Sequence, residues 1–288
     1  MITAAFLNGQ SDLYTALRSL GVGDDALPAI LDACDAATRA RLLSVDQGLL
    51  RAIMRQSVGG SGAADSIRAY LTAASPLPLF QPDVANSTTL ALLTEGQHPG
   101  MPTFSDHAFD PWFAAKGVTY GLGSYGEKRS VYETDAFADA ASPERRTVHL
   151  GIDVFAPAMT PVYAPLAGQV LHVTYNPDYL DYGNTLILQH HAGGVPFYTL
   201  YGHLAATLSG LLAVGDVVTP GQLIAHLGDW HENGGWAAHL HFQIMTDMLE
   251  QLSGNFFGVG HESLLDVWKD ICIDPNLILR ISAEKFTL

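Results

Sequence analysis

Two short stretches of the chain carry metal-binding side chains at spacings that suit β-strands. His239 and His241 are two residues apart in an apolar run, so a strand would turn both imidazoles to one face, roughly 7 Å apart. His149 and Asp153 are four residues apart, so a strand would also place them on one face, and a turn within residues 151–157 would bring both to one ion. Two histidines and one aspartate form a three-ligand set with an open fourth position, which is the pattern of catalytic zinc sites.

Such a site also needs a base and a partner for the oxyanion. The chain has no H-E-x-x-H pattern, which would supply a glutamate base, and no lysine or arginine between Arg146 and Lys269. The oxyanion partner must then be histidine, a hydroxyl, a backbone amide or the metal. His203 and His239 fit both tasks because imidazole titrates close to neutral pH. A zinc ion would lower the pKa of its water and polarise a carbonyl, so the pattern indicates metal-assisted hydrolysis.

Composition excludes several classes of partner. The chain has 288 residues, 48% of them hydrophobic and only 15% charged, which is enough for a sizeable core in one large or two small domains. The formal net charge of −15 argues against a nucleic-acid partner, which requires clustered lysine and arginine. No apolar stretch is long enough for a membrane span, and residues 1–10 lack the basic leader of a secretory signal. We therefore expect a cytoplasmic protein with no membrane partner, and the oligomeric state is left open.

Hydrophobic periodicity divides the chain into three parts. Residues 1–75 predict a small α-helical N-terminal domain, because their apolar residues recur at helical spacing. Residues 76–146 are rich in proline and glycine and predict a connector and an irregular segment. Residues 147–288 break into short strands cut by glycine, proline and asparagine, which is typical of a β domain, here followed by a C-terminal helix and tail. Residues 193–194 are one of the predicted turns between two strands.

Residues from about Val148 to Met245 carry an ordered set of motifs. In sequence order these are H-x-G-x-D (149–153), A-P and P-V-x-A (within 156–164), G-x-V (168–170), Y-G-N (182–184), Y-x-H-L (201–204), V-x-x-G-Q-x-I (218–224) and H-L-H-F (239–242). A single H-x-H would be weak evidence, whereas the ordered set is specific. It resembles the LytM/lysostaphin-type zinc metallopeptidases in order and approximate spacing. The resemblance implies a mainly β catalytic domain, with antiparallel sheets around a zinc cleft, beside the small α-helical N-terminal domain.

The resemblance also implies roles for five residues. It makes His149, Asp153 and His241 the ligands of one zinc ion per chain. It assigns His203 and His239 to catalysis, where they activate water and stabilise the tetrahedral intermediate, and which of the two is the general base stays open. The implied activity is that of a zinc metalloendopeptidase or amidase, with Gly- or D-amino-acid-containing cell-wall peptides and muropeptides as candidate substrates. The alternative is a catalytically idle module that keeps the fold and the metal and has a binding or regulatory role.

The approach to the H-L-H motif departs from the family pattern. Residues 231–238 replace the usual small Ser/Thr/Gly-rich run, and Met159 stands where glycine is common. These changes lie at the rim of the expected cleft, so they bear on the substrate more than on the metal, and His231 is a candidate lining residue. Together with residues 274–277 they resemble a cytoplasmic branch in which this domain is fused to kinase and aminotransferase domains. Family members are often latent, with an upstream segment over the cleft, a role that residues 76–146 could take.

Overall fold

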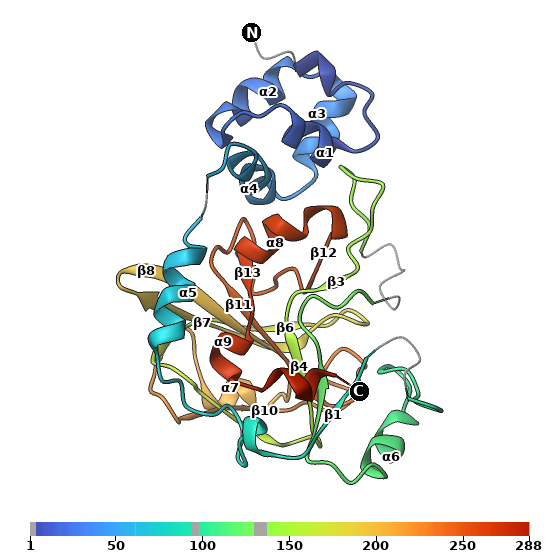
Figure 1. Cartoon of the computed structure of the whole chain (residues 1–288), viewed down its shortest axis with the longest axis vertical. Helices are drawn as coiled ribbons and strands as arrows, with labels where there is room; N and C mark the ends of the chain where they lie inside the picture. The colour runs from blue at the N-terminus through green and yellow to red at the C-terminus, as the bar shows by residue number, and fades with distance from the viewer. Residues whose placement is uncertain (1–3, 61, 94–97, 130–136, 288) are drawn as a thin grey trace.

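The computed structural model describes residues 4–60, 62–93, 98–129 and 137–287, and its helices and strands are labelled in Figure 1. The helices are α1 (Leu13–Ser19), α2 (Leu27–Ala33), α3 (Ala36–Leu43), α4 (Gln47–Ser57), α5 (Ala64–Ala73), α6 (Phe109–Ala114), α7 (Leu208–Leu211), α8 (Leu265–Ile271) and α9 (Asn276–Leu279). The strands are β1 (Thr89–Ala91), β2 (Tyr120–Gly123), β3 (Val148–His149), β4 (Ile152–Phe155), β5 (Pro161–Tyr163), β6 (Gly168–Asn176), β7 (Gly183–Ala192), β8 (Val195–Leu204), β9 (Val217–Val218), β10 (Leu223–His226), β11 (His239–Met245), β12 (Val259–Gly260) and β13 (Cys272–Ile273). Among the helices of the described residues, none is long and apolar enough to cross a membrane.

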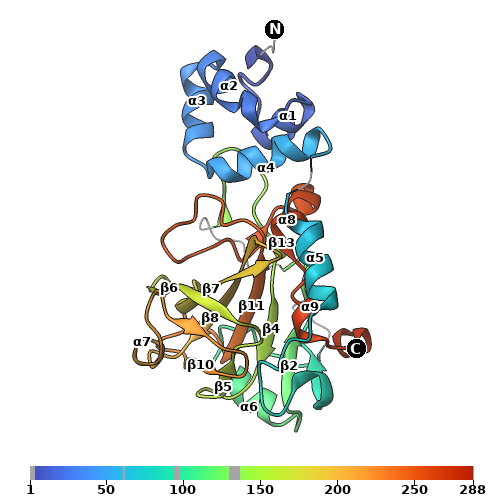
Figure 2. The same ribbon diagram turned by 90° about the vertical axis from the view of Figure 1, so that its left-hand side faces the viewer.

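Helices α1–α4 gather at one end of the molecule, and α8 lies between them and the strands (Figures 1 and 2). Asp12, Asp35 and Asp46 are the N-cap residues immediately before α1, α3 and α4, and each side chain accepts at least one hydrogen bond from a backbone N–H group of the first turn. The buried apolar residues of these helices, Leu50 of α4 among them, belong to one cluster that also includes Trp268 of α8. The four helices are thus anchored to the rest of the chain by apolar contacts through α8.

Helix α5 packs on the sheet instead. Its buried residues Ile67 and Leu71 belong to the same hydrophobic cluster as Leu188 of β7 and Phe197 of β8. The domain boundaries expected at residues 75 and 146 stay predictions.

The central sheet has the strand order β1-β2-β4-β11-β8-β7-β6-β9, and β13 also pairs with β11. Strands β1 and β2 are parallel, and the other pairs in this sheet are antiparallel. Two smaller sheets are formed by β5 with β10 and by β3 with β12. The structure confirms the predicted core of mostly β-sheet with several additional helices.

The hairpin between β7 and β8 shows how local sequence determines this sheet. Gly193 and Gly194 have φ values of 57° and 94° and connect Ala192 to its pairing partner Val195. A two-residue turn with both central φ values positive strongly favours glycine. The predicted turn at residues 193–194 is confirmed.

Strand β11 presents different side chains to its two faces. Leu240 and Phe242 are buried in the large hydrophobic cluster, so the alternation of a strand turns His239 and His241 to the opposite face. Asp153 of β4 is the direct cross-strand partner of His241. The expected alternation therefore holds, and it brings His241 and Asp153 together across one pair of strands.

Candidate metal centre

A bend in the chain, rather than one continuous strand, brings His149 to Asp153. His149 ends β3 and pairs with Val259 of β12, whereas Asp153 lies in β4 between β2 and β11. The chain bends between the two strands, at Leu150 and Gly151. A Cβ atom on Gly151 would lie 2.5 Å from Cε1 of His241, so only glycine leaves room for that imidazole. This packing explains why glycine stands between the first two predicted ligands.

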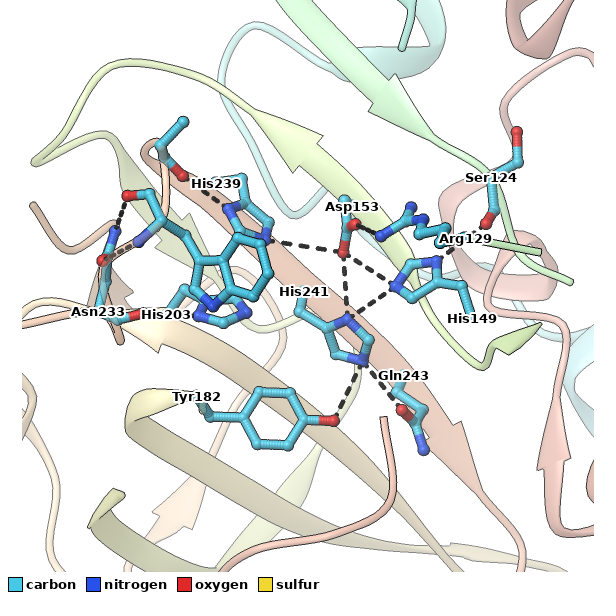
Figure 3. A network of polar contacts seen from close by, with 12 residues as sticks. Ser124, Arg129, His149, Asp153, Tyr182, His203, Asn233, His239, His241 and Gln243 are labelled. Carbon is cyan, nitrogen blue, oxygen red and sulfur yellow. Dashed lines mark hydrogen bonds and ion pairs between the residues drawn. The ribbon is translucent and has the colours of Figure 1, made fainter. Parts of the chain in front are cut away.

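Three donor atoms converge at the bend (Figure 3). Nε2 of His149 lies 3.0 Å from Nδ1 of His241, and Oδ1 of Asp153 lies 3.2 Å from the first atom and 3.1 Å from the second. Zinc bonds of about 2.0–2.1 Å at tetrahedral angles separate two ligand atoms by about 3.3 Å. The three side chains are buried and form a group that could hold a metal ion.

The hydrogen bonds of the two imidazoles direct their lone pairs to this point. Nδ1 of His149 lies 2.9 Å from the carbonyl oxygen of Ser124, so it carries the proton and donates it there. Nε2 of His241 lies 2.9 Å from Oε1 of Gln243. The Gln243 amide nitrogen donates to the carbonyl of Phe257, which leaves Oε1 as the acceptor for the His241 N–H. Two unprotonated nitrogens and a carboxylate oxygen thus face one another, and the donor set fits a bound cation.

The predicted ligand Asp153 has a cationic neighbour that we did not predict from the sequence. Nη1 of Arg129 lies 2.7 Å from Oδ2 of Asp153, and both side chains are at most 3% exposed. Residues 147–268 contain no lysine or arginine, and Arg129 reaches the site from the segment after β2. Its partner is the Asp153 carboxylate, so the expectation about the oxyanion partner stays a prediction.

Charges and burial set the protonation of the ligand side chains. Burial, together with the positive charge of Arg129, lowers the pKa of His149 to about 4. Burial alone would raise the pKa of Asp153, but the charges of His149 and Arg129 outweigh it and hold that pKa well below its usual range. A neutral imidazole and an ionised carboxylate are the forms that bind metal.

His203 and His239, the predicted catalytic residues, lie beside the three ligands. Their ring centroids are 4.3 Å apart, and Nε2 of His239 is 3.9 Å from Oδ1 of Asp153. Nδ1 of His203 donates to the carbonyl of Asn233, and Nδ1 of His239 donates to the carbonyl of Ala237. Each imidazole therefore keeps an unprotonated Nε2 on its other side.

Burial lowers the pKa of both of these histidines. For His203 the neighbouring imidazoles of His239 and His241 lower it further, whereas for His239 the charge of Asp153 opposes the shift. His203 also has a φ of 65°, a left-handed conformation that costs a non-glycine residue about 1–3 kcal/mol and is concentrated at functional sites. All five predicted site residues thus lie together.

Residues 147–252 match the profile of peptidase family M23. The match includes the three convergent donor residues and both flanking histidines. Residues 147–252 are a peptidase family M23 domain. No match was found among curated proteins.

Several solved structures are similar to the chain. A zinc-containing peptidase from Vibrio cholerae is 29% identical over 42% of this chain and 31% of its own, with a TM-score of 0.32. The lysostaphin catalytic domain from Staphylococcus simulans is 26% identical over 43% of this chain and 80% of its own, with a TM-score of 0.30. A putative M23 peptidase from Pseudomonas aeruginosa is 22% identical over 46% of this chain and 43% of its own, with a TM-score of 0.29. The chain spans less than half the length of the first and the third of these proteins.

The loop that precedes β11 in the M23 domain is organised by one buried asparagine. Oδ1 of Asn233 accepts from the backbone N–H of Trp236 at 3.0 Å, and Nδ2 donates to the Trp236 carbonyl at 2.8 Å. Because the carbonyl of Asn233 also receives the His203 N–H, the loop conformation and the His203 orientation are connected. The sequence showed this loop as a departure from the family pattern but did not show Asn233 as its centre.

The proline-rich connector contacts the M23 domain next to His239 through Phe104. The Phe155 ring stacks on His239, with centroids 4.6 Å apart and planes 17° apart, and Phe104 packs on Phe155 at 4.7 Å. The carbonyl of Phe104 accepts from the backbone N–H of Ala237. This part of the connector therefore packs against Phe155, the residue whose ring stacks on His239.

A cavity of about 360 Å³ lies beside the metal centre. Its lining includes Tyr182, His203, Trp236 and His241 from the M23 domain, Phe137 and Arg146 from the segment before it, and Phe256–Val259 after it. His231, a candidate lining residue, is exposed and does not line the cavity as far as the described residues define it. That an upstream segment covers the open coordination position of the metal ion stays a prediction.

Proposed function

We propose that the chain is a zinc-dependent endopeptidase or amidase that hydrolyses peptide bonds. The single observation that carries this proposal is the convergence of Nε2 of His149, Oδ1 of Asp153 and Nδ1 of His241 at 3.0–3.2 Å within an M23 domain. Such a buried set of lone pairs is unfavourable without a cation. The three residues would hold one zinc ion. When bound, zinc supplies activation of a water molecule and polarisation of the scissile carbonyl.

His203 and His239 would perform the proton transfers. Each Nδ1 donates to a backbone carbonyl, which fixes the ring orientation and leaves Nε2 as a base. An unprotonated Nε2 can accept a proton from water, and the imidazolium that results can donate it to the oxyanion or the departing amine. Because burial lowers both pKa values, the basic form is dominant at neutral pH. The two histidines thus have the protonation state that hydrolysis needs.

The cavity beside the ligands is the place for the substrate. Its aromatic walls, which include Tyr182 and Trp236, suit a peptide backbone with small side chains. We propose Gly- or D-amino-acid-containing peptides of cell-wall type, muropeptides among them, as the substrate class. The expected cytoplasmic location, and the resemblance to the branch fused to kinase and aminotransferase domains, stay predictions.

Metal analysis and hydrolysis assays test the proposal separately. We expect one zinc ion per chain in the wild type and loss of that ion in H149A, D153A and H241A. His191 is exposed and is not one of the five site residues, so H191A is the matched control that should keep the zinc. H203A and H239A should keep zinc and lose hydrolysis of muropeptides or Gly-rich peptides. Zinc binding in the wild type without hydrolysis of any of these peptides would instead favour the idle module.

A further inference from the structure

The two oxygens of the Asp153 carboxylate have different partners. Oδ1 faces Nε2 of His149 and Nδ1 of His241 at 3.2 and 3.1 Å, where the metal ion would lie. Oδ2 accepts a hydrogen bond from Nη1 of Arg129 at 2.7 Å, as Figure 3 shows. We propose that Arg129 is a positioning residue that makes Asp153 a one-oxygen ligand of the metal. The proposal rests on the metal centre of the proposed function and adds a residue from outside the M23 match.

The contact between Arg129 and Asp153 is built into the fold. Both side chains are buried, with exposures of 3% and 2%. Gly123 of β2 pairs with Asp153 in the sheet, and a Cβ atom at this glycine would lie 2.6 Å from Nη2 of Arg129. The close approach of the guanidinium to β4 therefore depends on glycine at position 123. A surface ion pair would need no such space.

A second carboxylate offsets the charge of Arg129. Nε of Arg129 donates to Oε2 of Glu127 at 3.1 Å, and Glu127 is only 13% exposed. Burying an unpaired guanidinium is strongly unfavourable, whereas this one has a carboxylate partner on each side. Glu127 and Arg129 together add no net charge next to the site. The attraction between Asp153 and a divalent cation is therefore largely preserved while its second oxygen is held.

The number of carboxylate oxygens that Asp153 offers decides the coordination number of the metal ion. A carboxylate can bind a metal through one or two oxygens, and a second oxygen would raise a three-ligand zinc site toward five-coordination. With Oδ2 bonded to Arg129, the protein supplies three donors and leaves one position of a tetrahedron open. Each of the three ligand side chains then has a hydrogen-bond partner on the atom that does not face the ion. The partner is Ser124 for His149, Gln243 for His241 and Arg129 for Asp153.

Cobalt(II) substitution of the full-length chain tests this inference without any substrate. Four-coordinate cobalt(II) absorbs visible light much more strongly than five- or six-coordinate cobalt(II). We expect the wild type to give the strong four-coordinate spectrum and R129Q to give a weaker one. Zinc affinity, measured by competition with a chromophoric chelator, should fall about 10- to 100-fold in R129Q, as is usual for loss of a partner of a ligand. R129K keeps a donor for Oδ2 and should recover part of the affinity and of the absorption.

Lys128 provides the matched control. It is the neighbour of Arg129 and pairs with Glu262 at 2.6 Å, at an exposed position away from Asp153. K128Q removes one cation from the same segment and should keep the wild-type spectrum and affinity. If R129Q is folded by circular dichroism but matches the wild type in both readouts, the inference is wrong. If R129Q does not fold, R129K decides by the same comparison, and a wild-type chain that binds no metal would overturn the proposed function instead.

Discussion

Oε1 of Gln243 lies 2.9 Å from Nε2 of His241, on the same face of β11. Since Gln243 is two residues after His241, the alternation of the strand alone brings the two side chains together. Gln243 is fully buried, and its amide nitrogen contacts the Phe257 carbonyl at 3.1 Å and the Cys272 sulfur at 3.2 Å. The position of its acceptor oxygen, and with it the tautomer of His241, is thus determined by the surrounding structure.

Replacement of Gln243 should weaken metal binding. Q243M keeps the approximate volume but removes the acceptor for the His241 N–H, so the proton can move to Nδ1, where it blocks the ligand atom. We expect zinc affinity to fall about 10- to 100-fold. Chelator competition measures this fall. Q169M makes the same substitution at an exposed strand position and should have no effect, and equal affinities in the two variants would contradict the assigned tautomer.

Glycine at position 151 should be needed for the metal centre rather than for the fold as a whole. In G151A the new methyl group would lie 2.5 Å from Cε1 of His241 and 2.9 Å from the Phe242 carbonyl oxygen. The imidazole must move, so we expect loss of zinc binding together with a destabilisation of about 1–3 kcal/mol from overpacking. Metal analysis and urea unfolding check the two effects.

Gly210 is the matched position for that test. A Cβ atom there meets no heavy atom within 4 Å, so G210A should keep both the zinc and the free energy of unfolding. A G151A chain that binds zinc as tightly as the wild type would show that the site can adapt to the methyl group.

The part of the site that lies on regular strands could be predicted from the sequence. His239, His241 and Asp153 follow from strand alternation, and Gln243 could have been found by extending the same pattern by two residues. Arg129 could not be found in this way, because it lies in an irregular segment without periodicity. Its partner is decided by the pairing of β2 with β4. Pairing between segments far apart in sequence has no local signal.

Some features of the fold could likewise be predicted from the sequence, and others could not. The hairpin turn at Gly193 was predictable because a two-residue turn with positive φ values requires particular residues. The packing of α5 on the sheet was not, because Ile67 and Leu71 give a helix an apolar side without indicating what covers it. Local chemistry thus predicts elements, whereas their partners depend on tertiary contacts.

His190 should make the metal-free protein less stable in mild acid. Its Nδ1 donates to the Ala167 carbonyl, its Nε2 accepts from Thr199, and burial lowers its pKa from 6.5 to about 4. The unfolded chain therefore binds a proton between these two pH values when the folded chain does not. The stabilisation is complete above pH 6.5 and is lost as pH falls toward 4, by about 3 kcal/mol.

The variant H190Q isolates this contribution. Glutamine can keep one donor and one acceptor but does not titrate, so the free energy of unfolding should fall less steeply between pH 6.5 and 4 than in the wild type. Urea unfolding at a series of pH values on metal-free protein measures both slopes. Equal slopes would mean that His190 does not supply the difference and that other buried histidines do.

Phe155 should affect catalysis without affecting the metal. Its ring stacks on His239 at 4.6 Å and contacts none of the three ligand side chains through a ring interaction among the described residues. F155L removes the flat surface that holds the His239 imidazole, so Nε2 loses its fixed direction. Since a misplacement of about 1 Å can cost about 100-fold in rate, we expect kcat to fall by up to that factor on any peptide that the wild type hydrolyses. Zinc affinity should stay at the wild-type value.

Phe197 stacks on the distant His190 in the same way, at 5.0 Å, so F197L controls for the general cost of removing a buried ring and should leave kcat unchanged in the folded protein. Equal kcat values in F155L and F197L would argue against a catalytic role for the orientation of His239.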